Sequence, residues 1–190
     1  MHLVDIPVRP GHLREAAEAI ERSTGMKVQI IGGTLVMSPT PRGKHAGTIL
    51  DLKDQIDPAI RPELRAFENS SILMPGSADD YATPDLTVLP KEWAADDEWL
   101  ADPADVALAI EVISTSERAK TILDKTNWYA AAGVTVLLNV DPRNGNWTLY
   151  TRPREGEYQG ILNGKYGDDI PLPAPLPTVK TGGFPIYSGH

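Results

Sequence analysis

The chain has 190 residues, which suits one domain with a sizeable core and is too short for two enzyme domains around a shared cleft. It contains no cysteine, which excludes disulfides, thiolate metal sites, iron–sulfur clusters and a cysteine nucleophile. The net charge of −8 argues against a nonspecific polyanion binder, although the range 79–111 alone holds ten acidic residues and one basic residue. No apolar run approaches the roughly 20 residues of a membrane helix, and the first five residues lack the order of a signal peptide. We therefore expect a cytoplasmic protein without membrane contact.

The first part of the chain predicts a helix followed by a hairpin. Apolar residues at helical spacing predict a helix over 11–22. Two runs of β-forming residues, 27–31 and 34–38, flank Gly32 and Gly33. Because paired glycines supply the positive φ angles of a tight turn, this pattern predicts a β-hairpin.

A second helix and four strands follow. Residues at helical spacing predict a helix over 43–56, which we expect Pro58 and Pro62 to end. Runs of β-branched and aliphatic residues predict strands over 64–71, 83–89, 106–113 and 134–140.

The predicted order in the middle of the chain is helix, three strands, helix, strand. Ser114 or Ser116 can cap the second of these helices, which we expect to run to about Ala132. A helix between the third and fourth strands permits a parallel pair with a right-handed crossover. We therefore predict a mixed α/β fold in one domain over 1–190, with a core at about 43–140 to which the N-terminal hairpin and C-terminal strands are added.

Glu111 interrupts a strand that is apolar on both faces. In the range 106–113 it shares one face with two alanines and an isoleucine, and the other face is aliphatic. A carboxylate there costs several kcal/mol unless it is paired, protonated or bound to a metal. The alternative is that Glu111 lies at the strand end, beside Ser114, and reaches solvent.

Asp85 and Lys125 are two further candidates, and each has an ordinary explanation. Asp85 follows Pro84 at the start of a predicted strand, where an Asp in a turn is common. Lys125 shares one side of its helix with two aromatic residues, and a lysine that only covers aromatic surface is the commoner case. Together with Glu111 they form a stronger candidate than either does alone. Carboxylates on successive strands can meet at one end of a sheet, and the following helix can place a lysine beside them.

Two carboxylates with open positions suit a hard cation such as Mg²⁺. Such an ion can activate water and stabilise a phosphoryl centre, and a nearby lysine can orient the water or stabilise developing negative charge. Asp85, Glu111 and Lys125 are therefore a candidate site for phosphoryl chemistry. A glycosidase-like carboxylate pair explains the two acids but gives Lys125 no role.

Several short blocks of the sequence resemble one known family. They are Thr83-Pro84-Asp85-Leu86, Ile110 to Ser114, Lys125 to Val134, Val140-Asp141-Pro142, the opening Ile31 to Pro39 with His45, and the closing Tyr166 to Pro173. In this order they resemble the Uma family of restriction endonucleases, which belongs to the PD-(D/E)XK nuclease superfamily.

The resemblance implies a restriction-endonuclease-like mixed sheet flanked by helices, with the core order αβββαβ. It implies that Asp85 and Glu111 ligate Mg²⁺, with Mn²⁺ able to substitute, and that the backbone carbonyl of Val112 is a further ligand. Lys125 would replace the lysine that the superfamily usually places two residues after the acid, where this chain has Ile113. The enzyme would hydrolyse phosphodiester bonds in DNA. The family and the many apolar C-terminal strands also predict a homodimer.

The chain departs from the family pattern in ways that keep a second hypothesis open. Members often carry an acid where this chain has Gln29 or Thr121. The acidic range 91–105 and the lack of a basic stripe favour a catalytically weak or inactive nuclease-fold module that binds nucleic acid or a protein. We expect 91–105 to lie away from the cleft or to cover it, because carboxylates in a DNA groove would repel phosphate. We interpret His45 as a hydrogen-bonded structural histidine rather than a substrate contact.

Overall fold

The computed structural model of the protein describes residues 9–188. The first five residues, from which we expect no signal peptide, lie outside this range. None of the helices in the described range is long and apolar enough to span a membrane. The elements in chain order are α1 (His12–Thr24), β1 (Lys27–Ile31), β2 (Thr34–Ser38), α2 (Gly43–Ile60), β3 (Leu64–Glu68), β4 (Ser71–Leu73), β5 (Tyr81–Ala82), β6 (Leu86–Pro90), η1 (Lys91–Ala95), β7 (Leu100–Ala101), η2 (Pro103–Asp105), β8 (Leu108–Val112), α3 (Ala119–Ala132), β9 (Val136–Asp141), β10 (Asn146–Arg154), β11 (Glu157–Lys165), β12 (Ile170–Pro171) and β13 (Thr178–Val179).

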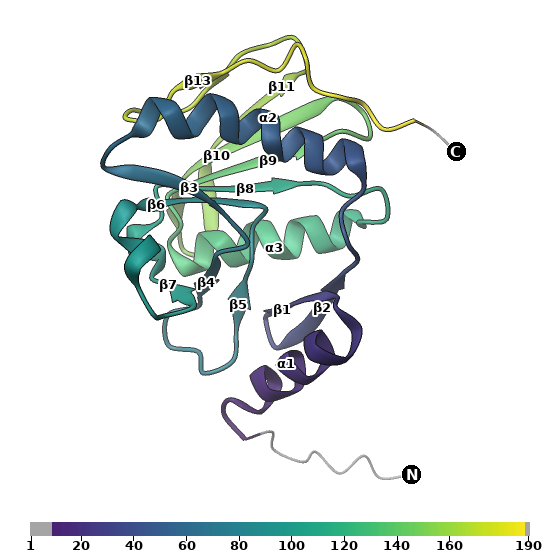
Figure 1. Ribbon diagram of the computed structural model, residues 1–190, viewed down its shortest axis with the longest axis vertical. Coiled ribbons are helices and arrows are strands. Elements are labelled where there is room, and N and C mark those ends of the chain that lie inside the picture. Colours follow the sequence, from purple (N-terminus) through teal and green to yellow (C-terminus); the bar gives the residue numbers. More distant parts are fainter. Residues whose placement is uncertain (1–8, 189–190) are drawn as a thin grey trace.

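Six strands form the central sheet, in the order β11-β10-β9-β8-β6-β3. Strands β8 and β9 are parallel, and the other neighbours are antiparallel. Helix α2 covers one face of this sheet and α3 covers the other (Figure 1). The order α2, β3, β6, β8, α3, β9 confirms the predicted αβββαβ core, and α3 makes the crossover between the parallel strands.

Strand β8 is buried on both faces and separates two hydrophobic cores. Leu108, Ile110 and Val112 pack with the residues of α2, whereas Ala109 packs with those of α3. Glu111 shares the face of Ala109 and is 5% exposed. The strand therefore carries this carboxylate into the interior, and the alternative in which it reaches solvent is wrong.

Two helix boundaries differ from the prediction. Helix α2 continues through Pro58 to Ile60. Ile56 and Ile60 are both buried, and this packing outweighs the one hydrogen bond that a proline cannot donate. Helix α3 begins only at Ala119 and has no side-chain cap, so neither predicted serine caps it. The segment 114–117 instead forms a turn that lines the cavity described below.

A second sheet has the order β2-β1-β5-β4-β7, and α1 packs against β1. The predicted strand 64–71 contains β3 and reaches the first residue of β4, whereas the predicted strand 83–89 contains most of β6 and begins just after β5. Strands β3 and β6 belong to the central sheet, whereas β4 and the neighbouring β5 belong to the second one. The chain therefore passes from one sheet to the other just before Asp85.

Asp79 and Asp80 connect α1 and the β1–β2 hairpin to the rest of the fold. Asp79 accepts hydrogen bonds from backbone N–H groups in the first turn of α1, those of Gly11, Leu13 and Arg14. Asp80 accepts hydrogen bonds from the hairpin turn and from α3, through the N–H groups of Gly32 and Gly33 and through Nε1 of Trp128. These two acids of the acidic region are therefore structural.

Candidate active site

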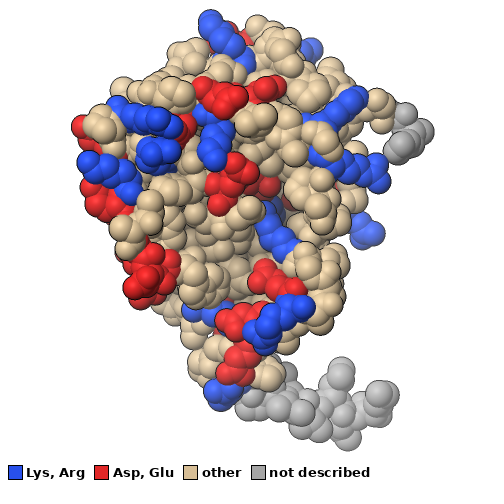
Figure 2. Space-filling view, in the orientation of Figure 1, with Lys and Arg blue, Asp and Glu red and all other residues tan. Residues whose placement is uncertain are grey.

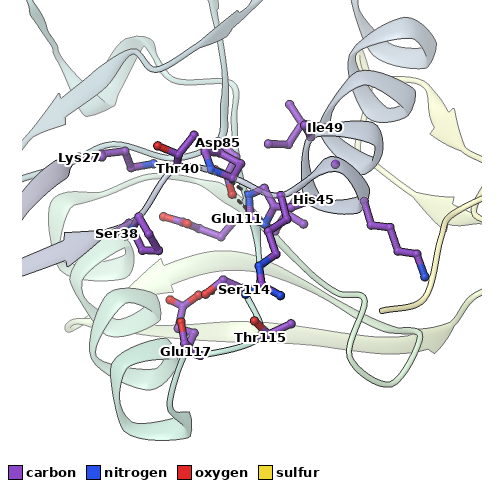
Figure 3. Close-up of a pocket in the computed structure, with 18 of the residues that line it drawn as sticks. Lys27, Ser38, Thr40, His45, Ile49, Asp85, Glu111, Ser114, Thr115 and Glu117 are labelled. Atoms are coloured by element: carbon purple, nitrogen blue, oxygen red, sulfur yellow. Dashed lines mark hydrogen bonds and ion pairs between the residues drawn. The ribbon is translucent and has the colours of Figure 1, made fainter. Parts of the chain in front are cut away.

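A cavity of about 830 Å³ opens between the β1–β2 hairpin, the start of α2, the ends of β6 and β8, and the C-terminal tail. The four residues predicted from the sequence, Asp85, Glu111, Val112 and Lys125, all line it. Figure 3 shows Asp85 and Glu111 together in this cavity, with His45 projecting from α2 beside them. Among the described residues, none that lines the cavity comes from 91–105, so this acidic segment lies away from the site.

Asp85 stands directly before β6 and is fixed by backbone contacts with β8. The β6–β8 ladder pairs Leu86 with Ile110, so Asp85 and Glu111 are the next positions along it. The N–H of Asp85 donates to the carbonyl of Ile110 at 2.9 Å, and Oδ2 of Asp85 accepts from the N–H of Val112 at 2.7 Å. The carboxylate is therefore anchored to the strand that carries Glu111.

The second oxygen of Asp85 faces two basic side chains. Oδ1 lies 3.4 Å from Nε2 of His45 and 3.8 Å from Nζ of Lys27. Burial alone would raise the pKa of Asp85, but His45, Lys27 and the N–H of Val112 together outweigh it and lower the pKa. Asp85 is thus ionised at neutral pH and offers an anionic oxygen to the cavity.

Both oxygens of Glu111 have partners on α3. Oε1 accepts a hydrogen bond from the hydroxyl of Tyr129 at 2.5 Å, and Oε2 lies 2.7 Å from Nζ of Lys125. Burial raises the pKa of Glu111, and Asp85 adds to the rise although Lys125 opposes it. A cation shared by the two carboxylates would relieve this repulsion.

Lys125 is 6% exposed and points toward the carboxylates rather than outward over aromatic surface. Besides Glu111, its Nζ lies 3.6 Å from Oε1 of Glu117. Burial would lower the pKa of Lys125, but Glu111 and Glu117 outweigh it and raise the pKa, so the side chain stays charged. The expected contact between Lys125 and Glu111 is present, and the catalytic role of the lysine stays a prediction.

His45 and Tyr187 extend the site beyond the predicted residues. Nδ1 of His45 lies 3.1 Å from the Tyr187 hydroxyl, which donates to the carbonyl of Ile113 at 3.0 Å. His45 is hydrogen-bonded, as expected, but it also contacts Asp85 and lines the cavity. Tyr187 lies in the C-terminal tail and carries no sequence signal for this position.

Sequence reasoning also missed Lys27, Glu117 and Tyr129 as neighbours of the site. Tyr129 follows Lys125 by four residues, so helical spacing puts both side chains on the same side of the helix. A lysine that faces Glu111 therefore brings Tyr129 toward Glu111 as well. Lys27 and Glu117 have no such signal, because strand order and a turn between elements bring them to the cavity.

The oxygen atoms gathered here fit a hard divalent cation. Asp85 and Glu111 supply anionic oxygens, and Val112 lines the same cavity. Within residues 9–188, no group of three or more His, Asp or Glu side chains is placed to hold a metal ion. Mg²⁺ commonly binds through one or two carboxylates and keeps several waters, so two carboxylates with one carbonyl suit it.

The surface around the site carries both signs of charge. On the face visible in Figure 2, Lys and Arg side chains alternate with Asp and Glu and do not form one continuous basic area. Basic residues do line the cavity itself, and they are Lys27, Arg42, Lys44 and Lys125.

Comparison with known proteins shows the fold and the family of this chain. The crystal structure titled "a putative nuclease belonging to DUF820 from Anabaena variabilis ATCC 29413" is similar to this chain, with a TM-score of 0.65 and 19% identity over 80% of this chain and 84% of that chain. At this identity the likeness shows a shared fold. No curated protein matches the sequence significantly. The model of the Uma2 family, described as "Putative restriction endonuclease", matches residues 14–182. This match includes every strand of the central sheet and all four predicted site residues, and the chain therefore belongs to the Uma2 family.

Proposed function

We propose that this chain is a metal-dependent endonuclease that hydrolyses phosphodiester bonds in DNA. The observation that carries the proposal is the pair of buried carboxylates, Asp85 and Glu111, which adjacent strands bring to one cavity beside Lys125. Membership of the Uma2 family and the nuclease-like fold support the same function.

Each residue of the site has a role in this proposal. Asp85, Glu111 and the carbonyl of Val112 would hold one Mg²⁺, with Mn²⁺ able to substitute. When bound, the ion would supply Lewis-acid activation of water and stabilise charge at phosphorus. Tyr129 holds Oε1 of Glu111, so that the carboxylate keeps its orientation. Lys125 holds Oε2 and is placed to orient water or to stabilise developing negative charge.

Nicking of supercoiled plasmid in Mg²⁺ tests the proposal. We expect Asp85→Asn and Glu111→Gln each to lower the rate by about 10²–10³, the effect of losing one preorganised electrostatic group. Asp124→Asn removes an exposed carboxylate of α3 and should leave the rate unchanged. Equal nicking by Asp85→Asn and the parent chain would refute the site.

The second candidate function is a nuclease-fold module that binds nucleic acid or a protein without cleaving. The mixed charge of the face in Figure 2 favours it, because an enzyme that holds long DNA commonly presents a basic surface. A parent chain that binds Mn²⁺ in the cavity but cleaves no DNA substrate would support this alternative.

We also propose that the chain acts as a homodimer. Strand β11 is an edge of the central sheet, and its Ile161 and Leu162 are 60% and 45% exposed. These consecutive side chains point to opposite faces of the sheet, and pairing of this edge with a second copy would give each of them a cross-strand neighbour. Light scattering that gives a mass of 20.7 kDa at micromolar concentration would contradict the proposal.

A further inference from the structure

Gln29 is a fully buried polar residue in the wall of the cavity. It lies on β1, is 0% exposed, and lines the same cavity as Asp85 and Glu111. Its Oε1 accepts a hydrogen bond from the backbone N–H of Thr83 at 2.9 Å. Because a backbone N–H bonds only to an acceptor, this contact identifies the oxygen end of the carboxamide. The donor end, Nε2, is therefore the end left for another partner.

No residue between 9 and 188 accepts a hydrogen bond from Nε2 of Gln29. Buried donors in proteins are nearly always paired, and an unpaired one costs free energy. The carboxylates of Asp85 and Glu111 are therefore not its partners, and their contacts are with Val112, Tyr129 and Lys125. Gln29 is thus a donor of fixed orientation, which an oxygen of a bound water or of a ligand would satisfy.

Lys27 presents a second donor on the same wall. It precedes Gln29 by two residues on β1, so both side chains project from one face of the strand. Nζ of Lys27 lies 3.8 Å from Oδ1 of Asp85, which is longer than a hydrogen bond. An ammonium and an amide N–H repel a cation, whereas both bind an anionic oxygen.

We infer that Lys27 and Gln29 form a phosphate subsite on β1, in which Nε2 of Gln29 donates a hydrogen bond to a non-bridging oxygen of the substrate. A phosphodiester carries two such oxygens, one for each donor. The choice of a phosphodiester as the ligand rests on the proposed function. Lys125 lines the same cavity from α3, where it contacts Glu111. Gln29 is thereby a substrate-binding residue, and an acid at this position would have the opposite effect on phosphate.

Gln29→Glu is the most direct variant, because it keeps the oxygen that accepts from Thr83 and replaces only the donor by an anionic oxygen. Asn127→Asp likewise replaces an amide by a carboxylate, at an exposed position of α3, and is the matched control. Binding of a labelled DNA duplex, followed by fluorescence anisotropy in Ca²⁺ without Mg²⁺, should weaken about tenfold or more for Gln29→Glu. The control should bind like the parent chain. Unchanged binding by Gln29→Glu would overturn the inference, and so would tighter Mn²⁺ binding with faster cleavage.

A second measurement uses the parent chain and does not depend on the variant folding. The side-chain amide protons of Gln29, observed by NMR and assigned through their proximity to Thr83, should shift when thymidylyl-thymidine is added. A methylphosphonate analogue, which lacks one anionic oxygen, should shift them less. A shift with inorganic phosphate but none with the dinucleotide would assign the subsite to free phosphate and overturn its role for DNA. No shift with either ligand would overturn the subsite itself.

The two proposals fail in different ways. If the parent chain binds DNA through Gln29 but does not nick plasmid, the subsite stands and the proposed nuclease function is wrong. If plasmid is nicked, and Gln29→Glu nicks and binds as the parent does, the nuclease function stands and the subsite is wrong.

Discussion

Nζ of Lys125 lies 2.7 Å from Oε2 of Glu111, and both side chains are more than nine-tenths buried. Two opposite charges held this far from water stabilise the fold only while both are present. Removal of one leaves the other buried and unpaired, at a cost of about 3–5 kcal/mol. A change to either residue of this pair should therefore affect both the packing of α3 on the sheet and the geometry of the candidate site.

Lys125→Met keeps the length of the side chain and removes its charge. We expect plasmid nicking to fall by about 10²–10³, and Mn²⁺ affinity to stay nearly unchanged because a lysine is not a ligand. Urea denaturation should show a loss of about 3–5 kcal/mol in the free energy of unfolding. The double variant with Glu111→Gln should recover part of this loss, because it removes both charges.

Lys120→Met is the control for this variant, since Lys120 is an exposed lysine of the same helix. It should change neither nicking nor stability by a measurable amount. A Lys125→Met protein that nicks plasmid as fast as the parent chain would show that Lys125 is a packing residue.

Two tyrosine hydroxyls near the C-terminal tail predict opposite outcomes for the same chemical change. The Tyr187 hydroxyl gives its proton to Ile113 and is left to accept from Nδ1 of His45, whereas the buried Tyr166 hydroxyl has no partner among residues 9–188. Tyr187→Phe should therefore lower the free energy of unfolding by about 1 kcal/mol and slow nicking, because His45 loses the contact that orients it toward Asp85.

Tyr166→Phe deletes an unsatisfied hydroxyl and should leave stability unchanged or slightly higher. Thermal unfolding of the two variants side by side makes the comparison. Equal destabilisation by both changes would contradict the hydrogen-bond assignment at Tyr187.

Local patterns explain why much of the core and the central site residues could be predicted. Period-two alternation in β8 places Glu111 on the face that α3 covers, and helical spacing places Lys125 on the inward side of α3. The position of Asp85 follows from its place at the start of β6, the strand that pairs with β8. These inferences need only the geometry of one strand, one helix and one crossover.

Contacts between distant parts of the chain could not be predicted in this way. Asp79 and Asp80 belong to the acidic range 79–111, and no local pattern shows that they accept hydrogen bonds from N–H groups of α1 and of the hairpin turn. Tyr187 reaches His45 across 142 positions of sequence. The low helix propensity of proline also led to the wrong prediction that Pro58 ends the helix. The burial of Ile60 decides the length of α2 instead.

The hydrogen bonds of Asp57 predict that the free energy of unfolding falls in acid. Its carboxylate accepts hydrogen bonds from Arg61, from Arg65 and from the backbone N–H of Ala66. Burial alone would raise the pKa of Asp57, but these contacts outweigh it and lower the pKa to about 2. Because the folded pKa lies below the unfolded value of about 3.9, the stabilisation is complete above that value and is lost as pH falls toward 2.

Asp57→Asn should therefore lower the free energy of unfolding by about 1–3 kcal/mol at pH 7, and the gap to the parent chain should narrow in acid. Urea denaturation of both proteins at several pH values measures that gap. Asp54→Asn changes an exposed acid of the same helix and should show no such dependence. A gap that stays constant from pH 7 to about pH 2.5 would contradict the lowered pKa of Asp57.

The exposed acids Asp96, Asp97 and Glu98 test whether the acidic segment acts on DNA binding. The segment lines no part of the cavity in the described range, and charges separated by more than about 8 Å are largely screened at physiological salt. We expect replacement of the three acids by their amides to change DNA affinity by less than about twofold at 0.15 M salt and to raise it modestly at 0.01 M, where screening is weak. Glu68→Gln removes one carboxylate from the cavity rim and should raise affinity at both salt concentrations. A large gain from the triple variant at 0.15 M salt would instead place the acidic segment on the path of the DNA.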